Sequence, residues 1–337
     1  MLTATYDITG GAARSYRLTV AADGSYRWTS RDGNTDLAYD AATGRAVEVV
    51  QGPDASGPPY AFVYTGVPAG GPGRAIVVPE PIGSLADFVT ALGRSGDRRV
   101  EETSTFGRPA WRYDGPIVVD QLGGRGTPDH AVADVDQATG VLLSLRETSA
   151  GRPVRSVTAS SVEVSDRLDR SRFQLQAPPG VKTTTESRGF RIVTLDEGRR
   201  LAGYDPLVPA EVPEGFRLQA VAVDPDVRSV TGAEGMNPPA VRIVTLRYAN
   251  GFHAFTVTQR PKGTGQWDDP FGAEGMSFRA EAVKSALPGR PALEGSLILD
   301  PPSPPHVWGI TGDLVVTVDG DLGASELRRV AGSFRAR

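Results

Sequence analysis

Histidines are the first residues to consider for metal or acid–base chemistry, and the chain has three. His130, His253 and His306 are far apart in the sequence, and none belongs to an HExxH or HxH pattern. Such spacing is what brings two imidazoles to one metal ion. We therefore expect neither a metal site nor a histidine-based catalytic site.

Other chemical motifs are equally scarce. The chain has no cysteine, which excludes disulfides, thiol catalysis and zinc–thiolate sites. The glycine-rich segment 123–126 lacks the Lys-Ser/Thr pair of a phosphate-binding loop, and no GxSxG motif is present. Asp134 and Asp136 share one face of a predicted strand and form a candidate carboxylate pair, but a solvated strand end explains them better. We predict that the protein is not an enzyme and uses no cofactor.

Composition excludes further classes of function. The net charge is −4, and arginines alternate with Asp and Glu instead of forming a basic stripe, which argues against nucleic-acid binding. No window approaches a membrane span, which needs about 18 apolar residues. The 40 glycines and 27 prolines are spread between β-like runs, a pattern typical of many short strands joined by turns.

The elements that must position any site are mainly strands. A length of 337 residues suggests two domains, because single hydrophobic cores stop growing at about 250–300 residues. In the first half, apolar and polar residues alternate between turn signals, which is typical of an antiparallel meander. The predicted strands are 2–8, 16–20, 26–28, 35–40, 46–50, 61–65, 100–105, 110–113, 132–135, 141–148 and 154–164.

One helix interrupts these strands. Ser84 and Asp87 fit a helix N-terminus, apolar residues between 85 and 92 fall on one helical face, and Gly93 stands where a C′ residue belongs. A helix of about ten residues is marginal alone. Its apolar face must therefore be buried against the sheet.

Residues 130–182 contain the most informative pattern. A strand ending in Asp136 is followed by a Thr139-Gly140 turn, two further strands and the stretch FQLQAPPG at 173–180. This succession of "D…TG" and "F…PP.G" resembles the end of the half-barrel in the lipoprotein-carrier superfamily (LolA/LppX-like) and in RseB/MucB-type sigma-factor regulators. The resemblance implies an α+β fold, mostly antiparallel β, with a half-barrel at 1–182 and the helix after Ser84 as its lid.

The second half follows a polar stretch at 183–190 that we expect to be a linker with few contacts. The expected elements are a helix opened by a capping box at 194–197 and ending near Gly203, strands at 218–223, 241–248, 252–259, 297–299, 306–311 and 314–318, and a closing helix at 325–331. The entry GYDPLVPAEVPEGF and the closing helix resemble the smaller C-terminal α+β domain of RseB-type regulators, which implies a second domain at 191–337. Residues 261–305 are longer and richer in Gly and Pro than that pattern, which leaves their topology open.

A half-barrel that does not close has a concave face whose apolar side chains need a lid or a ligand. A C16 acyl chain buried there would gain on the order of 10 kcal/mol before binding costs, at about 0.8 kcal/mol per CH₂. The alternative is that such residues form ordinary core. The candidates for this face are Tyr16, Leu18, Tyr26, Trp28, Phe62, Tyr64, Phe88, Leu92 and Trp111.

Our preferred hypothesis is a non-enzymatic extracytoplasmic regulator or sensor of the cell envelope. It would bind a lipid or lipoprotein acyl chain in the half-barrel and a membrane-anchored partner such as an anti-sigma factor. One alternative is a lipid or lipoprotein carrier of the envelope, and another is a β-sandwich adhesion or scaffold module. The resembled proteins have a signal peptide ahead of this point, so we expect secretion or membrane anchoring through a segment preceding Met1.

Overall fold

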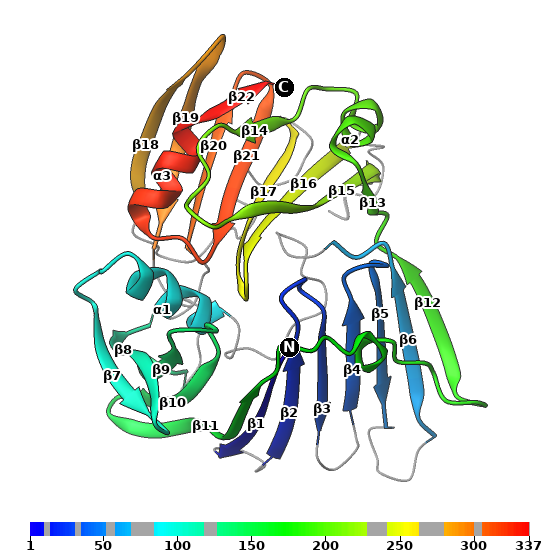
Figure 1. Ribbon diagram of the computed structural model, residues 1–337, viewed down its shortest axis with the longest axis vertical. Helices are drawn as coiled ribbons and strands as arrows, with labels where there is room; N and C mark the ends of the chain where they lie inside the picture. Colours follow the sequence, from blue (N-terminus) through cyan, green and yellow to red (C-terminus); the bar gives the residue numbers. More distant parts are fainter. Residues whose placement is uncertain are drawn as a thin grey trace.

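The structure is a computed structural model that describes residues 1–9, 14–30, 35–51, 58–68, 84–117, 127–227, 241–262, 280–299 and 305–336. Within these ranges the chain forms two large sheets, one small sheet and a few helices (Figure 1). The first large sheet fills the lower half of Figure 1 and the second fills the upper half. The prediction of a mostly antiparallel β-protein with few helices is confirmed.

The first sheet has 12 strands in the order β12-β6-β5-β4-β3-β2-β1-β11-β10-β9-β8-β7. Its strands are β1 (Leu2–Thr9), β2 (Arg14–Val20), β3 (Tyr26–Ser30), β4 (Thr35–Asp40), β5 (Arg45–Val50), β6 (Tyr60–Thr65), β7 (Val100–Thr105), β8 (Arg108–Pro116), β9 (His130–Asp136), β10 (Leu142–Ser149), β11 (Arg152–Val164) and β12 (Lys182–Ser187). The alternation of apolar and polar residues therefore predicted β1 to β11, but not β12.

The first strand lies in the interior of this sheet. β1 pairs antiparallel with β2 on one side and with β11 on the other, so that Leu2 lies opposite both Val20 and Val164. This pairing joins two meanders, β2 to β6 and β7 to β11, into one sheet. Local turn chemistry predicts most hairpins of the meanders, because most successive strands are joined through short connections, but it does not predict how the two meanders join.

The expected linker is for the most part a strand. Residues 182–187 form β12, which runs parallel to β6 with Lys182 opposite Tyr60 and Ser187 opposite Thr65. β12 is exposed along its whole length, which explains why its residues are polar and show no apolar periodicity. An edge strand needs only backbone hydrogen bonds to pair, so composition alone does not reveal it.

The helix α1 (Ser84–Arg94) packs against β7, β8 and β9. The Phe88 ring meets the Tyr113 ring edge-on at a centroid distance of 5.3 Å, and Phe88 is fully buried. The expectation that the apolar face of this helix is buried against the sheet is confirmed. Gly93 does not end the helix as predicted, because α1 continues through it to Arg94.

The second sheet has the order β13-β15-β16-β17-β21-β20-β19-β18. Its strands are β13 (Arg191–Val193), β15 (Arg217–Val227), β16 (Val241–Asn250), β17 (His253–Pro261), β18 (Ala280–Leu287), β19 (Arg290–Ile298), β20 (His306–Thr311) and β21 (Leu314–Gly320). Strands β18 and β19 both lie in the region 261–305, whose topology the sequence left open. A small sheet pairs β14 (Leu207–Pro209) with β22 (Phe334–Ala336).

The helices of the second half agree with their predicted caps. In α2 (Leu195–Ala202), Thr194 accepts a hydrogen bond from the Glu197 amide, and Gly203 adopts the left-handed conformation at φ 71°. Helix α3 (Ala324–Gly332) packs against β18, β19, β20 and β21. Each large sheet has its own cluster of buried apolar side chains.

The two halves touch through α1 and through the β16–β17 turn. Arg94 of α1 donates a hydrogen bond to the Asp321 carbonyl oxygen, lies 3.9 Å from the Glu326 carboxylate, and stacks 4.9 Å from the centroid of the Phe216 ring. In the other direction, Phe252 from the β16–β17 turn packs against the core of the first sheet.

Candidate functional site

A surface that we call the aromatic face covers one side of β1 to β6. Residues opposite each other on neighbouring antiparallel strands project to the same side of a sheet. One cross-strand row consists of Leu2, Val20, Tyr26, Tyr39, Ala46 and Tyr64. The next consists of Ala4, Leu18, Trp28, Leu37, Glu48 and Phe62, and Tyr6 and Tyr16 begin a third.

The predicted ligand-binding residues all belong to this face, to its continuation, or to α1. Tyr16, Leu18, Tyr26, Trp28, Phe62 and Tyr64 lie on the aromatic face, Trp111 lies on β8 on the same side of the sheet, and Phe88 and Leu92 lie on α1. The continuation runs from Ile8 through Val157, Leu145 and Ala133 to Tyr113. The structure thus gathers these residues on one surface, and their role in binding stays a prediction.

Burial divides these residues into two groups. Leu18, Trp28, Phe88 and Leu92 are at most 3% exposed and therefore form core. The others, namely Tyr16, Tyr26, Phe62, Tyr64 and Trp111, are half-buried. This second group offers most of the contact area that a ligand can reach without rearrangement of the sheet.

Aromatic rings on the face contact one another directly. Tyr16 stacks on Trp28 with ring centroids 4.4 Å apart. Phe62 lies between Tyr60, which it meets edge-on at 5.4 Å, and Tyr64, to which it is nearly parallel at 6.2 Å. Such contacts hold the rings in fixed orientations, and each is worth about 0.5–1.5 kcal/mol beyond the burial of area.

Glu48 places a carboxylate within this apolar surface. It lies between Leu37 on β4 and Phe62 on β6, and its side chain is half-buried. Burial raises the pKa of the Glu48 carboxyl above its ordinary value of 4.5. The pKa of the Tyr64 phenol is also raised, mainly by burial and further by the nearby Glu48 charge.

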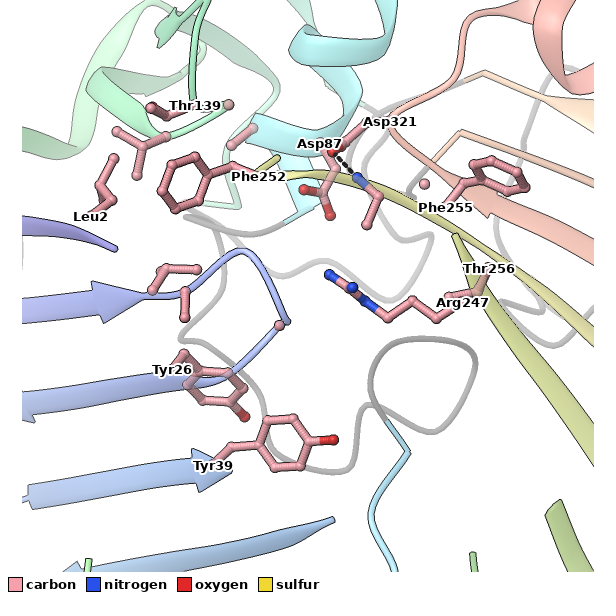
Figure 2. Close-up of a pocket in the computed structure, with 18 of the residues that line it drawn as sticks. Leu2, Tyr26, Tyr39, Asp87, Thr139, Arg247, Phe252, Phe255, Thr256 and Asp321 are labelled. Atoms are coloured by element: carbon pink, nitrogen blue, oxygen red, sulfur yellow. Dashed lines mark hydrogen bonds between the residues drawn. The ribbon is translucent and has the colours of Figure 1, made fainter. Parts of the chain in front are cut away.

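A cavity of about 220 Å³ lies where the first row of the aromatic face meets the second sheet (Figure 2). The wall from the first sheet is apolar and aromatic and includes Leu2, Leu18, Val20, Tyr26 and Tyr39. Of the predicted residues, only Leu18 and Tyr26 reach it. Thr139, Gly140, Val141 and Leu142 from the β9–β10 turn region and Phe252 complete the apolar side.

The opposite wall of the cavity is charged. Arg247 of β16 is 7% exposed, and Figure 2 shows its guanidinium and the Asp87 carboxylate of α1 facing the same space. Asp319 accepts a hydrogen bond from the Thr256 hydroxyl. Asp321 accepts one from the Ala254 amide at 3.0 Å and lies 3.6 Å from His253 Nδ1. The cavity therefore joins an apolar wall to a wall that contains both signs of charge.

Sequence reasoning missed this charged wall. Arg247, Asp319 and Asp321 are distant in sequence from Asp87, and only the packing of α1 against the second half brings them together. One local signal was present. Arg247 follows a mostly apolar run in β16, and an arginine buried in a strand needs a structural or functional partner.

Asp134 and Asp136 are not solvated, contrary to the prediction. They are 2% and 1% exposed, and each meets an arginine of β8. Arg112 Nε lies 2.7 Å from Asp134, and Arg108 Nε lies 2.6 Å from Asp136. Because β8 is the sheet neighbour of β9, the two arginines neutralise the two carboxylates, and the pair is structural.

The structure adds two findings on other site types. Within the described ranges, no group of three or more His, Cys, Asp or Glu side chains is arranged to hold a metal ion. In the same ranges, no helix combines the length and the apolar character needed to cross a membrane.

No family model and no curated protein matches the chain. Among solved structures, MucB in complex with MucA(peri) matches at 17% identity, with 100% of this chain and 93% of that chain covered and a TM-score of 0.28. The Pseudomonas aeruginosa MucA/MucB complex matches at 16% identity, with coverages of 100% and 93% and a TM-score of 0.30. MucB alone matches at 15%, with coverages of 100% and 92% and a TM-score of 0.30.

These matches cover the chain from end to end and agree with the RseB/MucB-type resemblance expected from the sequence.

Proposed function

We propose that the protein is a non-enzymatic regulator or sensor of the cell envelope, located outside the cytoplasm. Its aromatic face would bind the acyl chain of a lipid or lipoprotein, and its second half would bind a membrane partner such as an anti-sigma factor. The observation that supports this proposal is the aromatic face itself. Half-buried rings from several strands lie side by side in register on one surface that leads into a cavity.

The chemistry of this face suits an acyl chain. Tyr16, Phe62 and Tyr64 present ring surfaces, and Glu48 is the charged exception within the two rows. An acyl chain gains about 0.8 kcal/mol for each CH₂ that it removes from water. Ordering and association costs reduce that gain. A chain of about 16 carbons would still bind at micromolar concentration or below without any polar contact.

We further propose that the two halves are separate domains, divided after β12. Strand β12 adds to the first sheet, and β13 begins the second. Each sheet has its own buried cluster, so either could act on a different ligand. This division extends the first domain from residue 182 to Ser187, where β12 ends, which lies within the linker expected at 183–190.

The experiment that tests the proposal is native mass spectrometry of the gently purified protein, followed by organic extraction. We expect an adduct with the mass of a lipid or an acylated peptide, released by the extraction. A protein that remains free of adduct, and takes up no lysolipid when one is offered, would contradict the proposal.

The carrier alternative predicts the same adduct, so a second measurement must separate the two functions. A regulator should bind the periplasmic segment of a membrane-anchored partner, and acyl occupancy should change that affinity. A carrier should instead pass its lipid to acceptor vesicles at a rate that depends on their concentration.

A further inference from the structure

We propose that the cavity between the two sheets binds the head group of the lipid, and that this head group is zwitterionic, with an anion near Arg247 and a cation near Asp87. The inference rests on the proposed acyl-binding function of the aromatic face. It adds the class of ligand and the residues that select it.

The cavity continues the aromatic face. Leu2, Val20, Tyr26 and Tyr39 are consecutive members of the first row, and all of them line the cavity. Leu18, from the second row, lines it as well. A chain lying along the strands on this face, from the third row past the second to the first, therefore has one end directed toward the second sheet (Figure 1). Whatever group terminates that chain would enter the cavity.

The size of the cavity suits a head group. A water molecule occupies about 30 Å³ of liquid volume, so 220 Å³ holds a group several times larger than water. It does not hold an acyl chain of 16 carbons in addition. The space available thus matches the polar end of a lipid whose apolar part lies outside the cavity, on the aromatic face.

Arg247 supplies the anion-binding side. Its side chain crosses from β16 to the β2–β3 turn, where a Cβ placed on Gly24 would lie 3.2 Å from Arg247 Nη2. The guanidinium is held in a buried position at the rim between the halves and faces the cavity (Figure 2). A guanidinium donates two parallel hydrogen bonds to a phosphate oxygen pair, which makes it the side chain best suited to this anion.

Acidic side chains supply the cation-binding side. Asp87 projects from the first turn of α1 into the same space, and Asp319 and Asp321 lie on the wall behind it. Among the lining residues that the structure describes, Arg247 is the one arginine against these three acids, so their summed charge is negative when the carboxyls are ionised. A head group that is only anionic would meet repulsion from Asp87, whereas one with an additional ammonium group would be attracted to it.

Binding of two lysolipids and one cationic amphiphile, all with hydrocarbon chains of the same length, tests the inference. The probes are lysophosphatidylethanolamine, which is zwitterionic, lysophosphatidylglycerol, which is anionic, and an alkyl trimethylammonium, which is cationic, each titrated into the full protein below its micelle concentration. We expect the zwitterion to bind about tenfold more tightly than either of the others. Free phosphoethanolamine should bind far more weakly than its lysolipid.

Variants assign the selectivity to its residues. Asp87→Asn should remove the preference for the ethanolamine head over the glycerol head. Arg247→Lys keeps a positive charge in place but should weaken the binding of both phosphate-containing probes. Asp97→Asn, just beyond the end of α1, is the matched control and should leave all affinities unchanged. Circular dichroism and thermal unfolding show whether each variant is folded.

The possible outcomes separate the two proposals. If all three probes bind equally well, the head-group inference is wrong while the acyl-binding function stands. If none binds, the proposed function fails first. Tight binding of phosphoethanolamine alone would make the cavity an independent site for a soluble ligand and would also overturn the inference.

Discussion

Gly93 of α1 lies directly against the indole ring of Trp111 on β8. A Cβ placed on Gly93 would be 2.1 Å from Trp111 Cδ2, which is far inside van der Waals contact. The glycine that the sequence suggested as a helix end is therefore a point of close approach between the helix and the sheet. The helix runs one residue beyond it.

This contact predicts the effect of Gly93→Ala. Alanine favours an α-helix over glycine by about 1 kcal/mol, so helix propensity alone would stabilise the variant. We expect the opposite sign, a loss of about 1–3 kcal/mol in the free energy of unfolding, because the added methyl group overpacks against Trp111. Urea unfolding measures the change.

The matched control for Gly93→Ala is the double variant with Trp111→Leu. A smaller side chain on β8 leaves room for the methyl group, so Gly93→Ala should be neutral or stabilising in that background. If it destabilises both backgrounds equally, the contact does not explain the glycine.

Two neighbouring residues of β6 test the aromatic face. Phe62 projects onto it and Val63 projects to the other side, and both are half-buried. We expect Phe62→Ser to lower acyl uptake at least tenfold, because ring contact with the chain is lost, and Val63→Ser to leave it nearly unchanged. The measurement is displacement of a fluorescent fatty-acid analogue, with unfolding curves to compare stability. Equal losses in the two variants would refute our assignment of the ligand to this face.

Trp28 is a poorer probe of uptake than Phe62. It is 2% exposed and stacks on Tyr16, so its truncation would remove core packing worth about 3–5 kcal/mol. Loss of uptake in such a variant would report unfolding of the first sheet as much as loss of a ligand contact.

Glu48 predicts a pH dependence of stability. Its pKa is raised in the folded protein, so its contribution to stability is most favourable below its ordinary value of 4.5 and is lost as the pH rises through the folded value. We expect Glu48→Gln to be more stable than the parent at pH 7, by about 0.5 kcal/mol after allowance for solvent screening. At pH 4 the difference should shrink.

Glu101→Gln, at an exposed position of β7, is the control for Glu48→Gln and should show no such pH-dependent gain. A constant difference between Glu48→Gln and the parent across this pH range would mean that the charge of Glu48 is fully solvated.

For the Arg112–Asp134 pair, we predict that removing the arginine costs more stability than removing the carboxylate charge. Asp134 is buried, whereas the Arg112 side chain is 42% exposed. Arg112→Met leaves a buried carboxylate without its cation and should cost about 3 kcal/mol. Asp134→Asn leaves the arginine in water and keeps hydrogen-bond capacity toward Thr105 and Ser144, so it should cost about 1 kcal/mol. Urea unfolding of both variants at pH 7 shows which of them loses more free energy of unfolding.

The same pair also contributes to acid sensitivity. Burial alone would raise the pKa of Asp134, but hydrogen bonds from Arg112, Thr105 and Ser144 outweigh it, and the pKa lies below its ordinary value of 3.8. The stabilisation is therefore present above pH 3.8 and is lost as the pH falls through the folded value. Asp134→Asn should reduce the loss in the free energy of unfolding as the pH falls below 3.8. An unchanged pH dependence would mean that another group causes the acid sensitivity.

The sequence predicts those parts of the fold that depend on near neighbours. Alternation between Tyr16 and Val20, followed by an Asp23-Gly24 turn, is sufficient for a hairpin, and Thr194 and Gly203 are sufficient to bound α2. What it does not predict depends on pairings between distant segments. The parallel pairing of β12 with β6 uses backbone groups only, and the burial of Asp134 depends on an arginine of another strand.

In the candidate site too, features set by neighbouring residues were predicted and features set by distant segments were not. The parity of residues on successive strands placed Tyr16, Trp28 and Phe62 on one surface before the register was known. The charged wall of the cavity could not be foreseen, because Asp87 and Arg247 meet only after α1 docks on the second sheet. Patterns within an element predict its faces, whereas a site between elements follows from their packing.

The interior position of β1 also constrains the order of folding. Strand β1 must wait for β11, about 150 residues further along the chain, before its second edge is paired, whereas the strands within each meander pair with near neighbours in the sequence. Closure of so long a loop slows folding, because its entropy is lost before the distant contacts form. During that interval Leu2 to Thr9 present an unsatisfied edge to any other chain, so a chaperone that shields unpaired strands should raise the yield of folded protein.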